Sequence, residues 1–402
     1  MSQDHARQLT MTIEYMRTEL EAASWENSEI PAQLNQTLAE RDQALADVED
    51  EANPSCFRCV DGEGPLPALF VFGDSILDSG NNNYINTTTQ FQANWLPYGE
   101  TFFKAPTGRP CDGRLISDFI AEFANLPLIP AYFEIGTDKF LHGVNFASSG
   151  SGCLVETNRG IVIDLQTQLT HFNEVVQLLE NKLGKQQSQQ LLTDAVYMFS
   201  TGSNDYAFPY LTNPKFPFPK EQFSEMVLGN FTAILQAIYN KGGRKFSIFT
   251  LAPEGCSPGG RAFNAQLGGK SGDCMPELSA LLEMHSNALP QKLAQLQKNL
   301  SGFNYTLFDL YKIFTEKIDN PSKYGFNVST EACCGTGPFK GINSCGGKRQ
   351  VKEYELCQNV KDYVFFDASH PTEAANQQFA QLLWNGTTDV IAPHNLQSFF
   401  QL

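Results

Sequence analysis

Apolar residues between positions 67 and 402 fall into two kinds of run, which alternate along the chain. Runs of the first kind are short and continuous, as in "ALFVF" and "KFSIFTL", and are typical of buried strands. Runs of the second kind repeat every three or four residues, as in "DLQTQLTHFNEVVQLLENKLG", and predict amphipathic helices. The predicted strands are residues 68–72, 195–200, 245–251, 305–310 and 363–367, with a further short strand within 142–152. The predicted helices are residues 114–126, 164–184, 221–240, 277–299 and 372–384, with a short one after residue 310.

Strands that alternate with helices predict a mainly parallel sheet with helices on both faces. We therefore interpret residues 67–402 as one α/β domain. Sheets of this kind carry their functional sites just beyond the carboxyl ends of the strands, so functional residues are expected directly after the predicted strands.

Residues 1–66 differ from the rest of the chain in composition. They carry 14 acidic and 4 basic side chains, so −10 of the formal net charge of −16 falls there. Their apolar spacing is too irregular to predict a coiled coil. We expect an acidic N-terminal extension of unknown role, helix-prone or disordered, or a faulty gene-model exon, that does not belong to the functional unit.

The composition of the main body excludes two classes of partner. It is only mildly acidic and has no basic patch interleaved with aromatic residues, so nucleic acid is not the expected partner. No run of about 18 apolar residues is present, so no membrane span is predicted. Nothing in the sequence predicts the oligomeric state.

Ten cysteines are many for a cytosolic enzyme, and the pattern favours disulfides over a metal site. The glycine-rich segment 333–357 holds four of them, but it lacks the paired CxxC motifs or added histidines that zinc sites use. Cys56 and Cys59 form a single CxxC near the N-terminus, without evident further ligands. We therefore expect no metal.

Two pairings are predicted from the loops that disulfides would close. Cys256 and Cys274 flank a glycine-rich loop, and closing it would contribute about 3 kcal/mol on the chain-entropy model. The four cysteines of segment 333–357 are expected to pair among themselves, with the neighbours Cys333 and Cys334 bonded to different partners. Cys111 and Cys153 either pair with each other or are both free.

Six N-x-S/T triplets in the main body are consistent with the secretory pathway, where disulfides also form. The acceptor residues are Asn86, Asn230, Asn299, Asn304, Asn327 and Asn385. The chain begins without a recognisable signal peptide, which conflicts with that compartment. We nevertheless expect a secreted glycoprotein.

Polar residues suited to acyl-transfer chemistry follow three of the predicted strands. Ser75 follows strand 68–72, Asn204 follows strand 195–200, and Asp367 and His370 follow the last strand. A serine hydrolase needs a hydroxyl nucleophile, an imidazole base, a carboxylate that orients the base, and donors for the oxyanion. All of these parts are present.

These motifs resemble those of the plant GDSL esterase/lipase family in the SGNH hydrolase superfamily. "FGDS" with Ser75 matches the family's first block, and "NFASSGSG" with Gly150 matches the second. "GSND" with Asn204 matches the third block, and "DASHP" with Asp367 and His370 matches the fifth. The resemblance covers residues 67–390, including "PYGETFF" and "KFSIFTLAPEGC", and it implies a three-layer α/β/α sandwich.

The resemblance and the chemistry imply the same roles. Ser75 would attack an ester carbonyl, His370 would act as the base, and Asp367 would orient His370. The backbone N–H groups of Ser75 and Gly150 and the side-chain amide of Asn204 would form the oxyanion hole. No cofactor is implied, and the expected partner is a small-molecule or lipid ester.

Three functions remain open from the sequence. The leading one is hydrolysis of carboxylic esters of lipids or acylated plant metabolites. The same acyl-enzyme could pass its acyl group to an alcohol, which would make the protein an acyltransferase of specialised metabolism. A non-catalytic, defence-associated binding protein is the remaining alternative, which the presence of all the expected catalytic residues disfavours.

Overall fold

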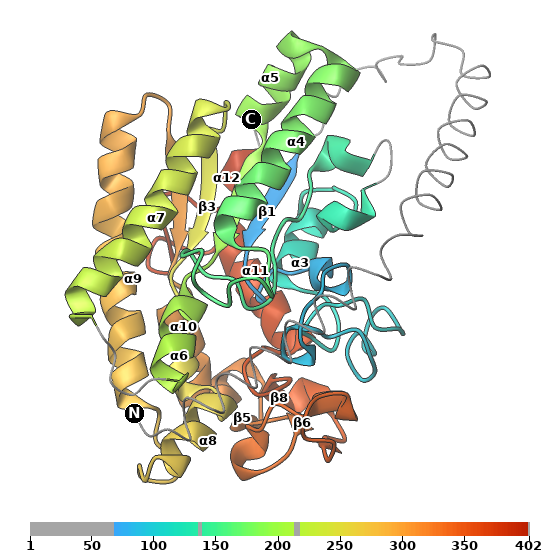
Figure 1. The fold of residues 1–402 in the computed structure, drawn as a ribbon, viewed down its shortest axis with the longest axis vertical. Helices are drawn as coiled ribbons and strands as arrows, with labels where there is room; N and C mark the ends of the chain where they lie inside the picture. Colours follow the sequence, from blue (N-terminus) through green and yellow to red (C-terminus); the bar gives the residue numbers. More distant parts are fainter. Residues whose placement is uncertain (1–67, 136–138, 213–217, 401–402) are drawn as a thin grey trace, which may run out of the picture. The chain divides into compact units, whose positions relative to one another are not determined.

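The structure is a computed structural model that describes residues 68–135, 139–212 and 218–400 (Figure 1). The N-terminal extension expected for residues 1–66, with Cys56 and Cys59, lies outside the described residues. The extension therefore stays a prediction, as does the boundary between it and the α/β domain.

Four parallel strands form most of the central sheet (Figure 1). They follow one another across the sheet in the order of the sequence, as β1 (Leu69–Gly73), β2 (Val196–Ser200), β3 (Lys245–Phe249) and β4 (Asn304–Phe308). The short strand β9 (Ile391–Ala392) pairs antiparallel with β4 at one edge. The register places Gly73 opposite Ser200, so β1 and β2 end at the same level of the sheet.

Alternation along each strand sorts its side chains onto two apolar faces. On β1, Phe70 and Phe72 belong to one hydrophobic cluster, whereas Leu69 and Val71 belong to the other. The helices that contribute most to the first cluster are α4 (Leu165–Leu183), α5 (Lys185–Asp194), α7 (Lys220–Asn240) and α9 (Pro276–Asn299). Those of the second cluster are α3 (Ile116–Phe123), α10 (Leu310–Asp319), α11 (Glu373–Asn385) and α12 (Gln397–Phe400). The predicted α/β fold, with a mainly parallel sheet between two helical layers, is confirmed.

Local capping residues define several helix ends. The Asp164 carboxylate accepts a hydrogen bond from the Thr167 N–H at the start of α4 (3.0 Å), and Thr372 caps α11 in the same way through Ala375. Gly184, at a φ of 78°, ends α4, because glycine reaches the left-handed region without steric cost. Two further helices, α6 (Ser203–Thr212) and α8 (Pro258–Gln266), follow the carboxyl ends of β2 and β3.

One predicted strand forms but does not join the central sheet. Residues 363–367 form β8 (Tyr363–Phe365), which pairs in parallel with β5 (Val328–Ala332) in a separate two-stranded sheet. The edge of β4 is occupied instead by β9, which comes from the end of the chain. A third small sheet pairs β6 (Cys334–Gly335) with β7 (Glu355–Leu356).

The short strand predicted within residues 142–152 is reduced to isolated bridges. Its backbone runs beside β1, with Val71 N–H donating to Val144 O (3.0 Å) and Phe146 N–H donating to Val71 O (2.7 Å). Asn145 faces the other way and bonds to the 130–132 backbone. The segment therefore bridges β1 and that loop.

The predicted disulfide pairings are confirmed. Cys256 bonds to Cys274, and the four cysteines of segment 333–357 pair as Cys333–Cys357 and Cys334–Cys345. Cys111 and Cys153 are both free and buried, which settles the alternative that the sequence left open. All six glycosylation acceptor asparagines of the main body are exposed.

Two expectations about absent features concern only the ranges that the structure describes. Within them, none of the helices has the length and apolar run needed to cross a bilayer. The same residues contain no group of three or more His, Cys, Asp or Glu side chains placed to hold a metal ion.

Candidate active site

The turn after β1 presents Ser75 at the carboxyl end of the sheet. Gly73 has a φ of 132°, and a Cβ atom there would lie 1.9 Å from the carbonyl oxygen of Ser200. Only glycine therefore fits where β1 passes this close to β2. Asp74 is buried, with its N–H bonded to Ser200 O (2.9 Å) and its carboxylate accepting from Ile76 N–H (3.1 Å). Ser75, the next residue, is partly exposed.

A buried polar network connects the residues after Ser75 to the loop that contains Gly150. The amide nitrogen of Asn81 donates to the carbonyl oxygens of Asn145 (2.8 Å) and Ala147 (2.9 Å). The Asp78 carboxylate accepts from the N–H of Ser149 (2.8 Å). Asn81 thus fixes a second segment of the site from within the loop that follows Ser75.

The loop at Gly150 is held against the end of β1. The Ser151 hydroxyl donates to the carbonyl oxygen of Gly73 (2.8 Å). Gly150 has a φ of 87°, and a Cβ atom there would lie 2.4 Å from the Phe91 ring. A Cβ atom at Gly152 would lie 2.3 Å from the Asp205 carboxylate. Side chains are therefore excluded at both glycines, and the backbone approaches its neighbours closely.

The third motif is bonded to the same loop. The side-chain amide of Asn204, at the start of α6, donates to the carbonyl oxygen of Ser151 (2.9 Å). The adjacent Asp205 is fully buried and accepts from the N–H groups of Cys153 (2.7 Å) and Leu154 (3.1 Å). Residues Gly73, Ser151 and Asn204 are thus joined by hydrogen bonds across three segments of the chain.

Asp367 and His370 form a pair within one turn. The Asp367 Oδ1 atom lies 2.8 Å from Nδ1 of His370 and also accepts the N–H groups of Ser369 (3.0 Å) and His370 (2.9 Å). The Asp367 side chain is 2% exposed and that of His370 is 16% exposed. The bond through Nδ1 leaves Nε2 of the imidazole available for another partner.

Charge interactions set the protonation of this pair. Burial alone would raise the pKa of Asp367, but the adjacent His370 and the hydrogen bonds hold it below its usual value. Burial likewise acts to lower the pKa of His370, and the Asp367 carboxylate reverses this and raises it. The ionised aspartate and a readily protonated histidine are therefore stable together.

Two further acids lie within electrostatic reach of His370. Burial raises the pKa of Asp74 to about 7, and the positive charge of His370 opposes this rise. Glu254, in the turn after β3, has its pKa raised to about 7 by burial, and His370 again opposes the rise. Since Asp74 precedes Ser75, the charge of His370 acts on the turn that carries the serine.

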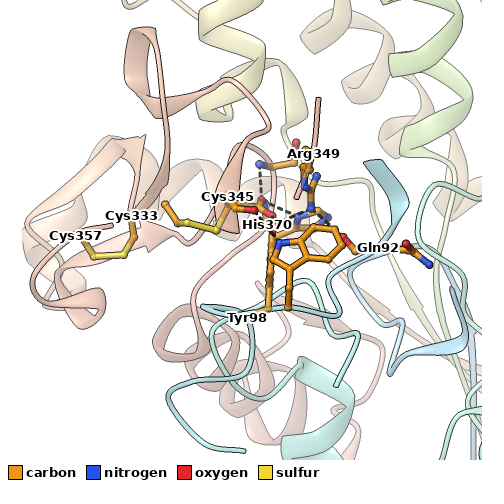
Figure 2. The surroundings of a disulfide bond; sticks show 11 residues. Gln92, Tyr98, Cys333, Cys345, Arg349, Cys357 and His370 are labelled. Atoms are coloured by element: carbon orange, nitrogen blue, oxygen red, sulfur yellow. Dashed lines mark hydrogen bonds and ion pairs between the residues drawn. A yellow bond between two sulfur atoms is a disulfide. The ribbon is translucent and has the colours of Figure 1, made fainter. Parts of the chain in front are cut away.

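Two residues that the sequence did not single out extend the Asp–His pair into a longer hydrogen-bonded chain. The hydroxyl of Tyr98 donates to Oδ2 of Asp367 (2.7 Å). Nη2 of Arg349 donates to the Tyr98 oxygen (2.9 Å), and Figure 2 shows Arg349 and Tyr98 near His370. Tyr98 belongs to the "PYGETFF" stretch, whose similarity to the family was the only available signal. Arg349 gave none.

Comparisons with known proteins show which family the chain resembles. The family model described as GDSL-like Lipase/Acylhydrolase matches residues 69–383. "GDSL esterase/lipase 5" of Arabidopsis thaliana is 49% identical over 346 residues, which cover 85% of this chain and 89% of the relative. "GDSL lipase" of Tanacetum cinerariifolium is 48% identical over 334 residues, 83% of this chain and 88% of the relative. "GDSL esterase/lipase 1" of Arabidopsis thaliana is 45% identical over 86% of this chain and 93% of the relative.

The fold and the comparisons together define the class as α/β ester hydrolases. The chain belongs to the GDSL lipase/acylhydrolase family, because the family model spans most of its length and several relatives exceed 40% identity. It is accordingly a carboxylic ester hydrolase, as the sequence motifs indicated.

Proposed function

We propose that the protein hydrolyses esters through a Ser75–His370–Asp367 triad and an acyl-enzyme intermediate. The observation that carries the proposal is the 2.8 Å bond between buried Asp367 and Nδ1 of His370, whose charge acts on Asp74 in the turn that presents Ser75. This bond selects the tautomer in which Nε2 of the neutral imidazole can accept a proton.

The reaction proceeds in two stages. The Ser75 oxygen attacks the ester carbonyl carbon while its proton moves to Nε2 of His370, and the tetrahedral intermediate expels the alcohol, which takes that proton. Water then attacks the acyl-enzyme with His370 again accepting the proton, and the carboxylic acid leaves as Ser75 is reprotonated. Asp367 stays ionised and stabilises the imidazolium in both stages.

The oxyanion hole consists of the N–H groups of Ser75 and Gly150 and the side-chain amide of Asn204. The bond from Asn204 to Ser151 O (2.9 Å) supports this role, because it fixes the amide beside the Gly150 loop and uses only one of its two N–H groups. Donors fixed before the reaction stabilise the developing charge without reorganisation.

The substrates we propose are carboxylic esters of lipids or acylated plant metabolites, and the compartment is the secretory pathway. The names of the plant relatives support the substrate class. The three disulfides and the six exposed acceptor asparagines support the compartment. A shift in mass on deglycosylation of protein secreted from a plant host would test the compartment.

Covalent trapping tests the mechanism. A fluorophosphonate should add to the protein and be found by mass spectrometry on the peptide that contains Ser75. Ser75→Ala should lose both labelling and ester turnover, whereas Ser322→Ala, at an exposed serine far from the motifs in sequence, should keep both. Turnover by a folded Ser75→Ala protein at the wild-type rate would contradict the triad. Adding a candidate alcohol to the assay separates hydrolysis from acyl transfer by the products formed.

A further inference from the structure

The second carboxylate oxygen of Asp367 has its own buried partner. His370 and two backbone N–H groups use Oδ1, whereas Oδ2 accepts the hydroxyl of Tyr98 at 2.7 Å. Tyr98 is fully buried, and its ring packs edge-on against Phe366 at 5.3 Å. Burial raises the pKa of Tyr98 well above its ordinary value, so the hydroxyl stays protonated and donates.

Arg349 continues this chain of contacts away from the histidine. Its Nη2 donates to the Tyr98 oxygen (2.9 Å) and to the carbonyl oxygen of Gln92 (3.1 Å), and its Nη1 donates to Gln90 O (3.3 Å). The guanidinium is buried and lies 5.6 Å from the centre of the Trp95 ring. Figure 2 shows Arg349 and Tyr98 arranged beside His370. A cation is therefore held inside the protein within electrostatic reach of the Asp–His pair.

Arg349 belongs to the cysteine-rich segment 333–357, which holds it in place. Cys345, bonded to Cys334, precedes Arg349 by four residues, and its carbonyl oxygen accepts the Trp95 indole N–H (3.0 Å). Gly346 has a φ of 81°, and a Cβ atom there would lie 2.2 Å from the Trp95 ring. The segment thus docks closely on the 90–98 loop, at a point that the disulfide fixes.

We propose that Tyr98 and Arg349 are positioning residues for the catalytic base, extending the triad to an Arg349–Tyr98–Asp367–His370 relay. The inference rests on the proposed function of Ser75, His370 and Asp367. Neither residue touches the reacting atoms in this scheme. Tyr98 holds the Asp367 carboxylate in place, and Arg349 holds Tyr98. The positive charge of Arg349 also partly offsets the effect of the Asp367 carboxylate on His370.

The charges around His370 determine the direction of the expected effect. Three acids face it, Asp367, Glu254 and Asp74, and Arg349 is the cation that opposes them. Burial and Arg349 lower the pKa of His370, whereas Asp367 and Glu254 raise it. Removing the Arg349 charge must therefore raise the pKa of His370 and shift the acid limb of activity to higher pH.

Loss of the Tyr98 hydroxyl acts on the same pair. A buried carboxylate oxygen that loses its donor is left unsatisfied, and its charge then acts more strongly on the imidazolium. Tyr98→Phe should lower kcat about 10-fold at unchanged KM and shift the acid limb upward by roughly 0.5 pH unit. Rates are expressed per active site, counted by complete fluorophosphonate labelling, so that unfolded protein does not contribute.

Variants of Arg349 separate charge from geometry. Arg349→Met should shift the acid limb upward by roughly 1 pH unit and lower kcat about 10-fold, whereas Arg349→Lys should keep the wild-type limb with an intermediate kcat. If Arg349→Met does not fold, Arg349→Lys and Tyr98→Phe still test the relay.

Two buried residues outside the four motif blocks serve as matched controls. Tyr197 donates its hydroxyl to Leu192 O (2.7 Å), and Lys245, at the start of β3, donates to Phe399 O (2.9 Å). Tyr197→Phe and Lys245→Met should lose stability but keep the wild-type pH profile and kcat per site.

The outcomes separate the two proposals. Wild-type kcat per site and an unshifted acid limb in Tyr98→Phe and Arg349→Met, with Ser75→Ala inactive, would overturn the relay and leave the triad standing. Turnover by Ser75→Ala at the wild-type rate would overturn the triad itself. A shifted limb together with lower kcat supports the relay, because a merely structural role would change stability alone.

Discussion

The two halves of the candidate site are held in place by different means. Ser75 and Asn204 follow β1 and β2, whose residues are all buried between two large apolar clusters. The Asp–His pair instead follows the short β8, outside the central sheet. The small buried cluster beside this pair consists of Ala93, Tyr98, Phe366 and three cysteines. Each of these cysteines is in a disulfide.

The difference reflects how much apolar surface each region can bury. Around β1, aromatic rings pack closely, such as Phe72 on Phe199 with centroids 4.8 Å apart. Segment 333–357 is rich in glycine and polar residues, so it has little apolar surface to bury. Two disulfides, closing separations of 11 and 24 residues, limit its freedom in the unfolded chain instead. The proposed nucleophile, Ser75, is thus positioned by packing, and the proposed base, His370, partly by covalent links.

The largest expected effect is the loss of either half of the triad. Ser75→Ala and His370→Ala should each lower kcat by about 10⁴-fold or more, and the double variant should be no worse than either, because the residues act as a unit. Steady-state rates with a p-nitrophenyl ester measure this. Additive losses in the double variant would show that the two halves act independently.

Removing the proposed oxyanion donor Asn204, in the half of the site that follows the packed strands β1 and β2, should have a smaller effect. Asn204→Ala should lower kcat by about 10²–10³-fold while KM changes little, because the lost bond acts on the transition state. An unchanged kcat in Asn204→Ala would contradict the proposed role of Asn204 in the oxyanion hole. Asn240→Ala, at an exposed helix end, is the control.

Removing disulfides directly tests the other half of the site, the Asp367–His370 pair beside the disulfide-bonded segment 333–357. Cys334→Ala/Cys345→Ala and Cys256→Ala/Cys274→Ala should each reduce the free energy of unfolding by about 3 kcal/mol. Only the first pair should also lower kcat per active site, by about 10-fold, because it loosens the segment that carries Arg349. Urea unfolding and active-site titration measure the two quantities. Equal kcat values for both pairs would show that segment 333–357 does not influence the base.

The packed half should show a pH-dependent stability. Burial raises the pKa of Asp74 to about 7, so between pH 4 and 7 the folded chain holds a proton that the unfolded chain releases, and stability falls as pH rises. Asp74→Asn should match the wild type near pH 4 and be more stable at pH 8 by about 1–4 kcal/mol. Urea unfolding at pH 4 and at pH 8 tests this, with the exposed Glu353→Gln as control. A difference in unfolding free energy between Asp74→Asn and the wild type that is the same at both pH values would contradict the raised pKa of Asp74.

The smallest effect concerns the acidic N-terminal residues. A chain that begins at Pro65 should have the melting temperature and kcat of the full chain, because residues 1–66 carry none of the catalytic motifs. Thermal unfolding and rates of both chains, made in an oxidising host, test this. A loss of several degrees on truncation would show that the segment packs on the hydrolase domain.

Much of the fold could be predicted from local patterns. Continuous apolar runs placed β1, β2 and β3 within about two residues, because a buried strand needs little beyond length and hydrophobicity. The heptad-like stripe placed α4 nearly to the residue. The failure at β8 has a physical reason: periodicity identifies a strand but not its neighbour, and β9 occupied the edge of β4.

The sequence by itself determined the family, the α/β class, the candidate triad and the Cys256–Cys274 pair, since these depend on short motifs and on loop lengths. The structure decided which partners Cys333 and Cys334 take and that Cys111 and Cys153 are free. Only the tertiary structure decided how the parts support one another. Asn81 fixes the loop before Gly150 from 64 residues away, and Arg349 reaches Tyr98 across 251 residues. Such contacts carry no local periodicity or motif. They arise when packing and disulfides bring distant segments together, so they were beyond the reach of sequence patterns.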